Sequence, residues 1–508
     1  MSSPPAVAAG RPAAGARVGL TVALLAAPLL VAVLLAFWSL NFGLPYLFRP
    51  DEDVVVGRAV RMAAQGSLNP LFAAYPPLAF DLMALAEKLT GHLQGPLQVA
   101  PSGAYLTGRA VSALFFLVTV GCTFVAARGA YGNKAGLLAG TMVAVAPLAV
   151  RQAHFATTDM IQTALVAAAL AVVAVADQRR LLLWGAALAG LAAATKYSGG
   201  LVLVAVLVAG GLGFGWRATF PSLLGVALAA FLALFLPLTP NLPDYARGLS
   251  FLGGNAVHRG SGLPPGVLFN ATVTLPFGLG LGAFAMALAG VALAVWRRRT
   301  IDVSILAFVV AYYLVQGIGR EDFFRYMLPL VPALSILASG LLPALRGGWQ
   351  GVGLGLGLVL LVPSLYASVS GDRLLGIEDT RVEAAAWINA HVPPGASISS
   401  PYYGGPFYSA GQIQDNRRYV PSRLAASFAQ GLYTPRFQIN EPDPSYKIVA
   451  SGPPLQGPMP TSAHRIVARF GAGAGGAVYD PLDSFYVPIW GFGEIERPGP
   501  SIVIVRLP

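Results

Sequence analysis

Long apolar stretches recur along the first 371 residues, and most charged residues fall between them. A helix needs about 20 consecutive apolar residues to cross a bilayer. We therefore predict eleven membrane-spanning helices. They cover approximately 18–40, 110–127, 135–150, 160–176, 181–195, 197–216, 218–238, 272–296, 303–319, 326–345 and 347–370. The third and fifth stretches are short, so a tilted, broken or partly misplaced helix stays open at these two places.

The first apolar stretch follows Arg11 and Arg17 and has two interpretations, a signal peptide or a retained span. Its apolar run is longer than the usual core of a signal peptide, and no convincing cleavage site follows it. We therefore treat it as the first membrane span.

Basic residues between the spans indicate the orientation, because cytoplasmic loops carry an excess of Lys and Arg. With the N-terminus in the cytoplasm, eleven basic residues lie on the cytoplasmic side: Arg11, Arg17, Arg128, Lys134, Arg179, Arg180, Arg217, Arg297, Arg298, Arg299 and Arg346. Short loops on the other side hold six: Arg151, Lys196, Arg247, Arg259, Arg320 and Arg325. Eleven crossings then place the C-terminus outside.

Three segments outside the predicted spans, residues 41–109, 239–271 and 372–508, lie on the outer face in this topology. The first contains five prolines among apolar stretches, which favours short helices along the membrane interface. The last begins with a capped amphipathic helix over 379–389 and continues with short strand-like runs at 397–399, 447–450, 465–470 and 501–506. We predict two domains, a membrane domain over 1–371 and a small extracytoplasmic α/β domain over 372–508.

Composition excludes a soluble enzyme and argues against binding to nucleic acid. Apolar residues make up 56% of the 508 residues and charged ones 11%, with a net charge of +11. Soluble proteins carry roughly a quarter charged residues. The 11 basic and 11 acidic residues after Gly371 cancel, so the basic excess belongs to the apolar part, as expected of cytoplasmic helix ends. The single cysteine, Cys122, excludes an intrachain disulfide.

The densest acidic cluster, Asp51-Glu52-Asp53, follows the first span on the outer side. A carboxylate in a partly dry site can act as a general base, taking a proton from a hydroxyl as its oxygen attacks. On a helix Asp51 and Glu52 would point about 100° apart, so we expect them to have different roles. A helix N-cap followed by first-turn acids is the structural alternative.

A second group, Arg151, His154 and Asp159, lies between the third and fourth spans. Charges this close to the membrane need partners or a wet cavity. An Arg–Asp pair that holds the loop and a direct substrate contact both stay open. His154 by itself is more typical of a packing residue than of a ligand.

Two further cations lie on the same outer face. Lys196 follows the fifth span, where it can either extend to lipid headgroups or neutralise a phosphate at the interface. Arg325, next to Tyr326, precedes the tenth span. A carboxylate and two cations on one face suit transfer from a polyprenyl-phosphate sugar: Asp51 would deprotonate an acceptor hydroxyl, and Lys196 and Arg325 would stabilise the departing phosphate.

Several strings of the membrane part resemble the GT-C glycosyltransferases, and most closely the glycosyltransferase family 39 type that includes protein O-mannosyltransferases. They are Asp51-Glu52, Ala74-Tyr75-Pro76-Pro77-Leu78, residues 151–159, Ala194-Thr195-Lys196-Tyr197-Ser198-Gly199 and Phe324-Arg325-Tyr326-Met327-Leu328-Pro329. The resemblance implies a mainly α GT-C bundle and an inverting transferase that uses a lipid-phosphate-linked sugar. It implies that Asp51 is the catalytic base and that Lys196 and Arg325 contact the donor phosphate. The expected acceptor or cavity residues are Glu52, Tyr75, Arg151, Asp159, His258 and Tyr326.

The chain departs from the related lipid A aminoarabinose transferases, which tend to have Glu-Lys-Pro where it has Tyr75-Pro76-Pro77. Their acceptor, and any metal contact through that Glu, therefore do not carry over. His258 could bind phosphate or, with a carboxylate, a divalent metal, but one His makes no coordination set and no cofactor is firmly implied. In the tail, the stretch 480–488 has the pattern of turns and strand ends.

The expected partners are a polyprenyl-phosphate sugar, membrane lipid and an extracytoplasmic acceptor that is a lipid, a glycan or a protein hydroxyl. The expected location is a plasma membrane, the inner membrane of a bacterium. A transporter or flippase of lipid-linked sugars is the main alternative, but it predicts charges near the bilayer midplane, whereas here they gather at helix ends. A third alternative is an inactive scaffold of the same family.

Overall fold

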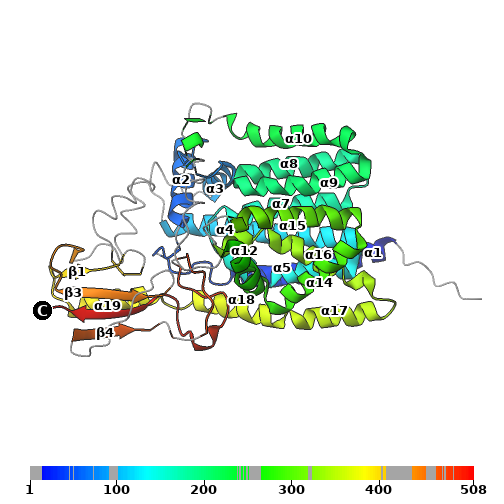
Figure 1. Cartoon of the computed structure of the whole chain (residues 1–508). Coiled ribbons are helices and arrows are strands. Elements are labelled where there is room, and N and C mark those ends of the chain that lie inside the picture. Colours follow the sequence, from blue (N-terminus) through cyan, green and yellow to red (C-terminus); the bar gives the residue numbers. More distant parts are fainter. Residues whose placement is uncertain are drawn as a thin grey trace, which may run out of the picture.

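The computed structural model has a bundle of helices at one end and a small sheet at the other (Figure 1). It describes residues 14–44, 46–49, 51–72, 74–90, 101–236, 238, 242–243, 245–247, 250, 265–318, 323–401, 404–407, 437–452, 465–471, 473, 476–483 and 485–508. Helices α2 and α3 lie where the bundle faces the sheet (Figure 1). The fold is mainly helical, as predicted, with a small α/β part at the C-terminal end.

The helices of the first 375 residues cover the predicted apolar stretches, several of which are divided into shorter helices, and α2 and α3 lie between the first two stretches. The α-helices are α1 (Ala14–Phe37), α2 (Glu52–Gln65), α3 (Leu78–Thr90), α4 (Pro101–Tyr131), α5 (Asn133–Ala144), α6 (Pro147–Ala153), α7 (Asp159–Val175), α8 (Arg179–Thr195), α9 (Leu203–Phe214), α10 (Trp216–Ala233), α12 (Gly266–Phe269), α13 (Leu275–Leu279), α14 (Leu281–Arg297), α15 (Thr300–Ile318), α16 (Leu330–Ser339), α17 (Trp349–Leu360) and α18 (Val362–Leu375). Tighter or wider turns are η1 (Tyr197–Val202), η3 (Asn270–Thr274), η4 (Phe324–Met327) and η5 (Leu342–Ala344).

Within the described residues, six helices are long and apolar enough to cross a membrane, or up to eight if each of two bent pairs is one span. Asp159–Val175 and Leu330–Ala344 are shorter apolar helices. The chain is thus a multi-pass membrane protein.

The predicted span over 272–296 is bent in the structure. The chain bends by 118° between Gly266–Leu279 and Leu281–Arg297. Gly280 lies at the bend with φ of +88°, and a Cβ there would lie 2.0 Å from the hydroxyl of Ser364. A residue with a side chain fits neither this backbone conformation nor this close packing.

The third predicted span is also broken, which was one of the alternatives left open for it. Asn133–Val145 and Pro147–Ala153 meet at 61°. Pro147 is the first residue of α6. Proline lacks an N–H and disfavours helical backbone in the residue before it, so one helix ends here and the next begins.

The sheet is five-stranded, with the order β2-β1-β3-β5-β4. Its strands are β1 (Ser397–Ser399), β2 (Gln438–Ile439), β3 (Tyr446–Ser451), β4 (Ile466–Phe470) and β5 (Ser501–Arg506). β1 pairs in parallel with β2 and β3, whereas β5 pairs antiparallel with β3 and β4. The four predicted strands are confirmed, and β2 is additional because two residues are too few to form a pattern.

Helix α19 (Thr380–His391) begins the tail as predicted. The side chain of Asp379 accepts a hydrogen bond from the backbone N–H of Arg381, which satisfies one of the free donors at the helix start. Ala384, Ala385 and Ile388 are buried together with Ile502 and Ile504 of β5, so the helix covers the sheet.

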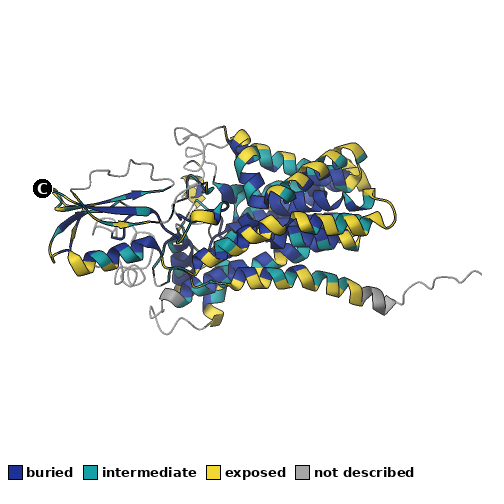
Figure 2. Cartoon of the chain, turned by 90° about the horizontal axis from the view of Figure 1, so that it is seen from below, coloured by how far each residue is buried: buried dark blue, intermediate teal, exposed yellow. Residues whose placement is uncertain are grey.

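The surface of the helical bundle differs from that of a soluble protein, because it exposes many large apolar side chains. The interior of the bundle is buried and its surface is exposed (Figure 2). Large apolar side chains are among the exposed ones, for example Leu34 on α1, Ile318 on α15 and Val359 on α17. In a multi-pass protein such an apolar surface faces lipid, where its exposure carries no hydrophobic cost.

Candidate functional site

Asp51 is the N-cap residue of α2, a helix that lies where the bundle faces the sheet (Figure 1). Its φ of 73° is left-handed, which is uncommon for a residue with a side chain but is tolerated by Asp and Asn. Its side chain is 40% exposed, and its carboxylate forms an ion pair with Nη2 of Arg325 at 3.0 Å. The carboxylate is therefore both held in place and open to solvent.

Arg325 lies on the short turn η4, 274 positions further along the chain. Its guanidinium packs over the ring of Phe323, with 4.1 Å between Cζ and the ring centroid. Burial opposes its charge, but the nearby Asp51 and other acidic groups outweigh burial and raise the pKa of Arg325. The turn thus presents a fixed cation to Asp51.

Lys196, at the end of α8, is the second cation of the site. Its Nζ lies 2.8 Å from Oδ1 of Asp159, the first residue of α7. The same Nζ lies 4.5 Å from the ring centroid of Tyr326 and 5.8 Å from that of Tyr75. Burial lowers the pKa of Lys196, although Asp159 acts in the opposite direction.

These contacts join six residues into one cluster, which we call the outer-face cluster: Asp51, Tyr75, Asp159, Lys196, Arg325 and Tyr326. Five separate segments of the chain contribute to it. Burial, and the charge of Asp51, raise the pKa of the Tyr75 phenol, so Tyr75 is a neutral hydrogen-bond donor at physiological pH. Two cations, two carboxylates and two aromatic rings thus meet on one face.

Glu52 has a different partner from Asp51, as expected for adjacent residues that point in different directions. Its carboxylate forms a two-point ion pair with Arg109 of α4, at 2.9 and 2.8 Å, and both side chains are fully buried. It also accepts the backbone N–H of Ala156 at 2.9 Å. These contacts connect α2 to α4, and the expected contact of Glu52 with an acceptor stays a prediction.

Arg151 and His154 also bind protein groups. Arg151 donates to the backbone oxygen of Val487 at 2.6 Å and to Oδ2 of Asp483 at 3.3 Å, so its carboxylate partner lies in the tail, whereas Asp159 pairs with Lys196. His154 is buried between the backbone oxygens of Val150 and Trp38, at 2.9 and 2.8 Å. These contacts favour a structural role for both.

Asp480 and Asp483 are the tail residues that the sequence pattern missed. Both are buried, and both contact the membrane part: Asp480 accepts the backbone N–H of Phe324, and Asp483 pairs with Arg49 and Arg151. The available signal was that two carboxylates lie in an apolar stretch, on the face where the predicted topology also places basic residues.

His258 lies outside the described residues. Among the residues that the structure describes, no group of three His, Cys, Asp or Glu side chains is placed to hold a metal ion.

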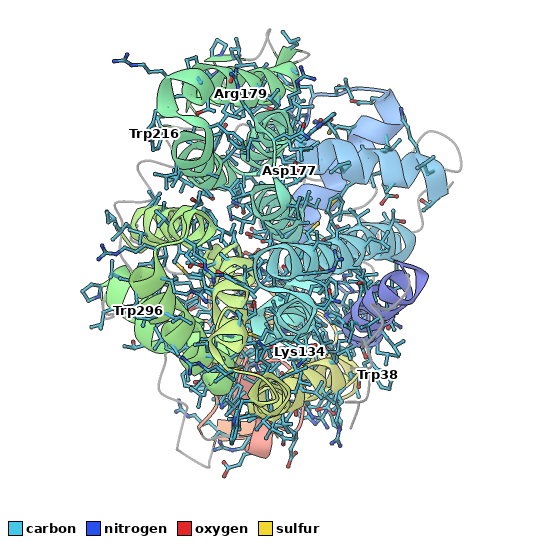
Figure 3. The ribbon with its side chains drawn as sticks, turned by 90° about the vertical axis from the view of Figure 1, so that its right-hand side faces the viewer. Trp38, Lys134, Asp177, Arg179, Trp216 and Trp296 are labelled. Carbon is cyan, nitrogen blue, oxygen red and sulfur yellow. The ribbon has the colours of Figure 1, made fainter. Side chains whose placement is uncertain are left out.

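The other end of the bundle is chemically different. Figure 3 looks at the end opposite the sheet, where Lys134, Asp177, Arg179, Trp216 and Trp296 are labelled. Tryptophan is enriched at both membrane–water interfaces, whereas an excess of basic residues is typical of cytoplasmic loops. The outer-face cluster therefore lies at the end away from this basic rim.

Comparisons with known proteins bear on the fold. Residues 101–241 match the family model of dolichyl-phosphate-mannose-protein mannosyltransferases. ArnT from Cupriavidus metallidurans, in a crystal structure bound to undecaprenyl phosphate, superimposes with a TM-score of 0.53 at 18% identity, over 86% of this chain and 94% of ArnT. The oligosaccharyltransferase AglB from Archaeoglobus fulgidus, in complex with an inhibitory peptide and a dolichol-phosphate, gives a TM-score of 0.52 at 11% identity, over 85% of this chain and 69% of AglB. Comparison of the sequence with curated proteins found no match.

The chain therefore has the GT-C fold, as its sequence motifs predicted. The matched segment 101–241 includes Arg151, Asp159 and Lys196, whereas Asp51 and Arg325 lie outside it. The roles of individual residues rest on the geometry described above.

Proposed function

We propose that this chain is an integral-membrane glycosyltransferase that moves a sugar from a polyprenyl-phosphate donor to an acceptor outside the cytoplasm. The observation that carries the proposal is the outer-face cluster, in which a partly exposed carboxylate, Asp51, shares a site with Arg325 and Lys196. The similarity to ArnT and AglB, whose structures contain polyprenyl phosphates, supports this donor class.

Lys196 and Arg325 are the proposed contacts of the donor phosphate. Both are nearly buried, with side chains 13% and 7% exposed, and both already hold a carboxylate. In a site that excludes most water, fixed cations stabilise the negative charge that grows on a departing phosphate far better than they do in bulk water.

Asp51 is the proposed general base. A donor phosphate at Arg325 would compete with Asp51 for the guanidinium and release the carboxylate. Asp51 then takes the proton of an acceptor hydroxyl as that oxygen forms a bond to the anomeric carbon of the sugar. The bond from this carbon to the phosphate oxygen breaks, and polyprenyl phosphate leaves with inversion at the carbon.

Tyr75, Asp159 and Tyr326 complete the proposed cavity. Tyr75 and Tyr326 place aromatic rings beside Lys196, and Asp159 holds its ammonium. The acceptor remains a lipid, a glycan or a protein hydroxyl, because the cluster contains groups that bind hydroxyls without selecting among these classes.

The proposed topology has eleven crossings, a cytoplasmic N-terminus and an extracytoplasmic C-terminus, in the inner membrane of a bacterium. The basic rim of Figure 3 on the end opposite the sheet supports this direction. We propose a catalytic membrane domain over 1–371 and a C-terminal domain over 372–508.

A transfer assay tests the proposal. Purified protein is incubated with a panel of labelled polyprenyl-phosphate sugars and candidate acceptors, and the labelled product is measured. We expect transfer from at least one donor. Movement of the donor across a vesicle membrane without transfer would instead support a transporter.

Lys196→Ala is expected to lower kcat/KM for the donor about 100-fold, because one of two cations that stabilise the departing phosphate is lost. Lys134→Ala is the matched control, since this exposed lysine lies on the opposite face (Figure 3). Donor kinetics are compared at equal amounts of folded protein. An equal loss of folded protein and activity would give Lys196 a structural role only.

Stability is expected to depend on pH through Asp53, on α2. Burial, together with the charge of Asp51, raises the pKa of Asp53 to about 6 from a value near 3.8. This raised pKa stabilises the folded protein below pH 3.8, and the stabilisation is lost as pH rises through 6. The melting temperature of wild type should therefore fall relative to Asp53→Asn between pH 4 and pH 7. Parallel melting profiles would contradict the burial of this charge.

A further inference from the structure

A short tail segment, residues 480–483, contacts both segments that carry the Asp51–Arg325 pair. Its two carboxylates are buried, although the segment lies about 155 positions beyond Arg325. We call it the tail turn. Asp51 and Arg325 are 274 positions apart in the chain, so their distance depends on tertiary contacts such as those of the tail turn.

Asp483 holds the side that carries Asp51. Its Oδ1 accepts from Nη1 of Arg49 at 2.7 Å, and its Oδ2 from Arg151 at 3.3 Å. Arg49 lies two residues before Asp51, and its guanidinium also packs on the ring of Phe155, 4.7 Å from the centroid. These partners outweigh burial and lower the pKa of Asp483. Asp483 is thus an anion fixed between two guanidiniums.

Asp480 holds the side that carries Arg325. Its Oδ2 accepts the backbone N–H of Phe324, the residue directly before Arg325, at 2.8 Å. Its Oδ1 accepts the N–H of Leu482 at 3.1 Å, which closes the tail turn on itself. The start of η4 is therefore fixed by a group of the tail and not only by its own helical hydrogen bonds.

We propose that Asp480 and Asp483 are positioning residues for sugar transfer. Asp480 binds the backbone N–H of Phe324 and Asp483 binds Arg49, and together these contacts set the distance between Asp51 and Arg325. The inference rests on the proposed function, to which it adds a role for the C-terminal domain: its docked tail turn completes the geometry of the donor site. A small displacement of a reacting group lowers rates steeply, by about 100-fold for 1 Å.

Hydrogen exchange measures the positioning directly and needs no substrate. In the full-length protein, Asp480→Ala removes the acceptor of the Phe324 N–H, so exchange in the peptide spanning 323–328 should rise at least 10-fold. Asp480→Asn keeps one side-chain oxygen and should restore most of the protection. Asp443→Asn, an exposed carboxylate of the same domain, is the control and should leave this peptide unchanged.

Transfer kinetics then separate positioning from folding. At equal amounts of folded protein, Asp480→Ala should raise the donor KM about 10-fold or more, because it releases Arg325. Asp483→Asn should mainly lower kcat, because it releases the segment of Asp51. Asp480→Asn should again lie near wild type.

The two proposals fail in different ways. Unchanged exchange at 323–328 in Asp480→Ala would overturn the positioning role, whatever the wild-type activity. Increased exchange in Asp480→Ala, together with no sugar transfer by wild type, would support the contact between Asp480 and Phe324 but overturn the proposed transferase function. Kinetic losses that only follow the loss of folded protein would reduce the tail turn to a structural contact and overturn the proposal.

Discussion

Asp51→Asn is expected to lower the rate of sugar transfer by about 10²–10⁴-fold and to leave the protein folded. The amide cannot take the proton of the acceptor hydroxyl, but it has the size of the carboxylate and tolerates the left-handed backbone of this position. Its oxygen can still accept from Arg325. Turnover under saturating donor and acceptor, with the melting temperature of the same sample, measures both parts.

Asp177→Asn is the control for this substitution, because Asp177 is an exposed carboxylate on the opposite end of the bundle (Figure 3). It should retain wild-type turnover. Full turnover in Asp51→Asn would remove Asp51 from the mechanism, and a large drop in its melting temperature would show that the ion pair to Arg325 serves folding.

Arg109→Ala is expected to destabilise the protein by about 3–5 kcal/mol, the largest change in stability that the structure implies. The substitution leaves the fully buried carboxylate of Glu52 without its two-point partner. It also removes hydrogen bonds to the backbone oxygens of Leu40 and Phe42, which hold the chain between α1 and α2. Denaturation of the purified protein in detergent, followed by helical circular dichroism or intrinsic fluorescence, measures the loss.

Arg128→Ala, on the same helix α4, provides the comparison. Arg128 is exposed and its Nε donates to the side chain of Asn133, so its loss should change stability by about 0.5 kcal/mol or less. Equal stability of the Arg109 and Arg128 variants would show that the buried pair contributes little. Glu52→Gln, which keeps the shape of the side chain, should lie between wild type and Arg109→Ala.

The contrast between Asp51 and Glu52 shows what two adjacent carboxylates do in different surroundings. Asp51 faces a partly exposed site and a single guanidinium, whereas Glu52 is enclosed by Arg109 and the Ala156 N–H. The side chain of Asp51 is 40% exposed, whereas that of Glu52 is fully buried. The tail turn adds a third kind of carboxylate, which serves the site through the backbone and side chains that it holds.

The membrane class, the approximate helices and the four longer strands follow from the sequence because they depend on local properties, namely the length of apolar runs and the placement of breakers such as Pro147. The motifs around Asp51, Lys196 and Arg325 also identified the residues that meet in the outer-face cluster. The tertiary structure decided that these residues meet. It also decided the bend at Gly280, the burial of Glu52 against Arg109, and the contacts of Asp480 with Phe324 and of Asp483 with Arg49. Each of these depends on groups far apart in the chain, and the identity of a distant partner leaves no trace in the local pattern around either residue.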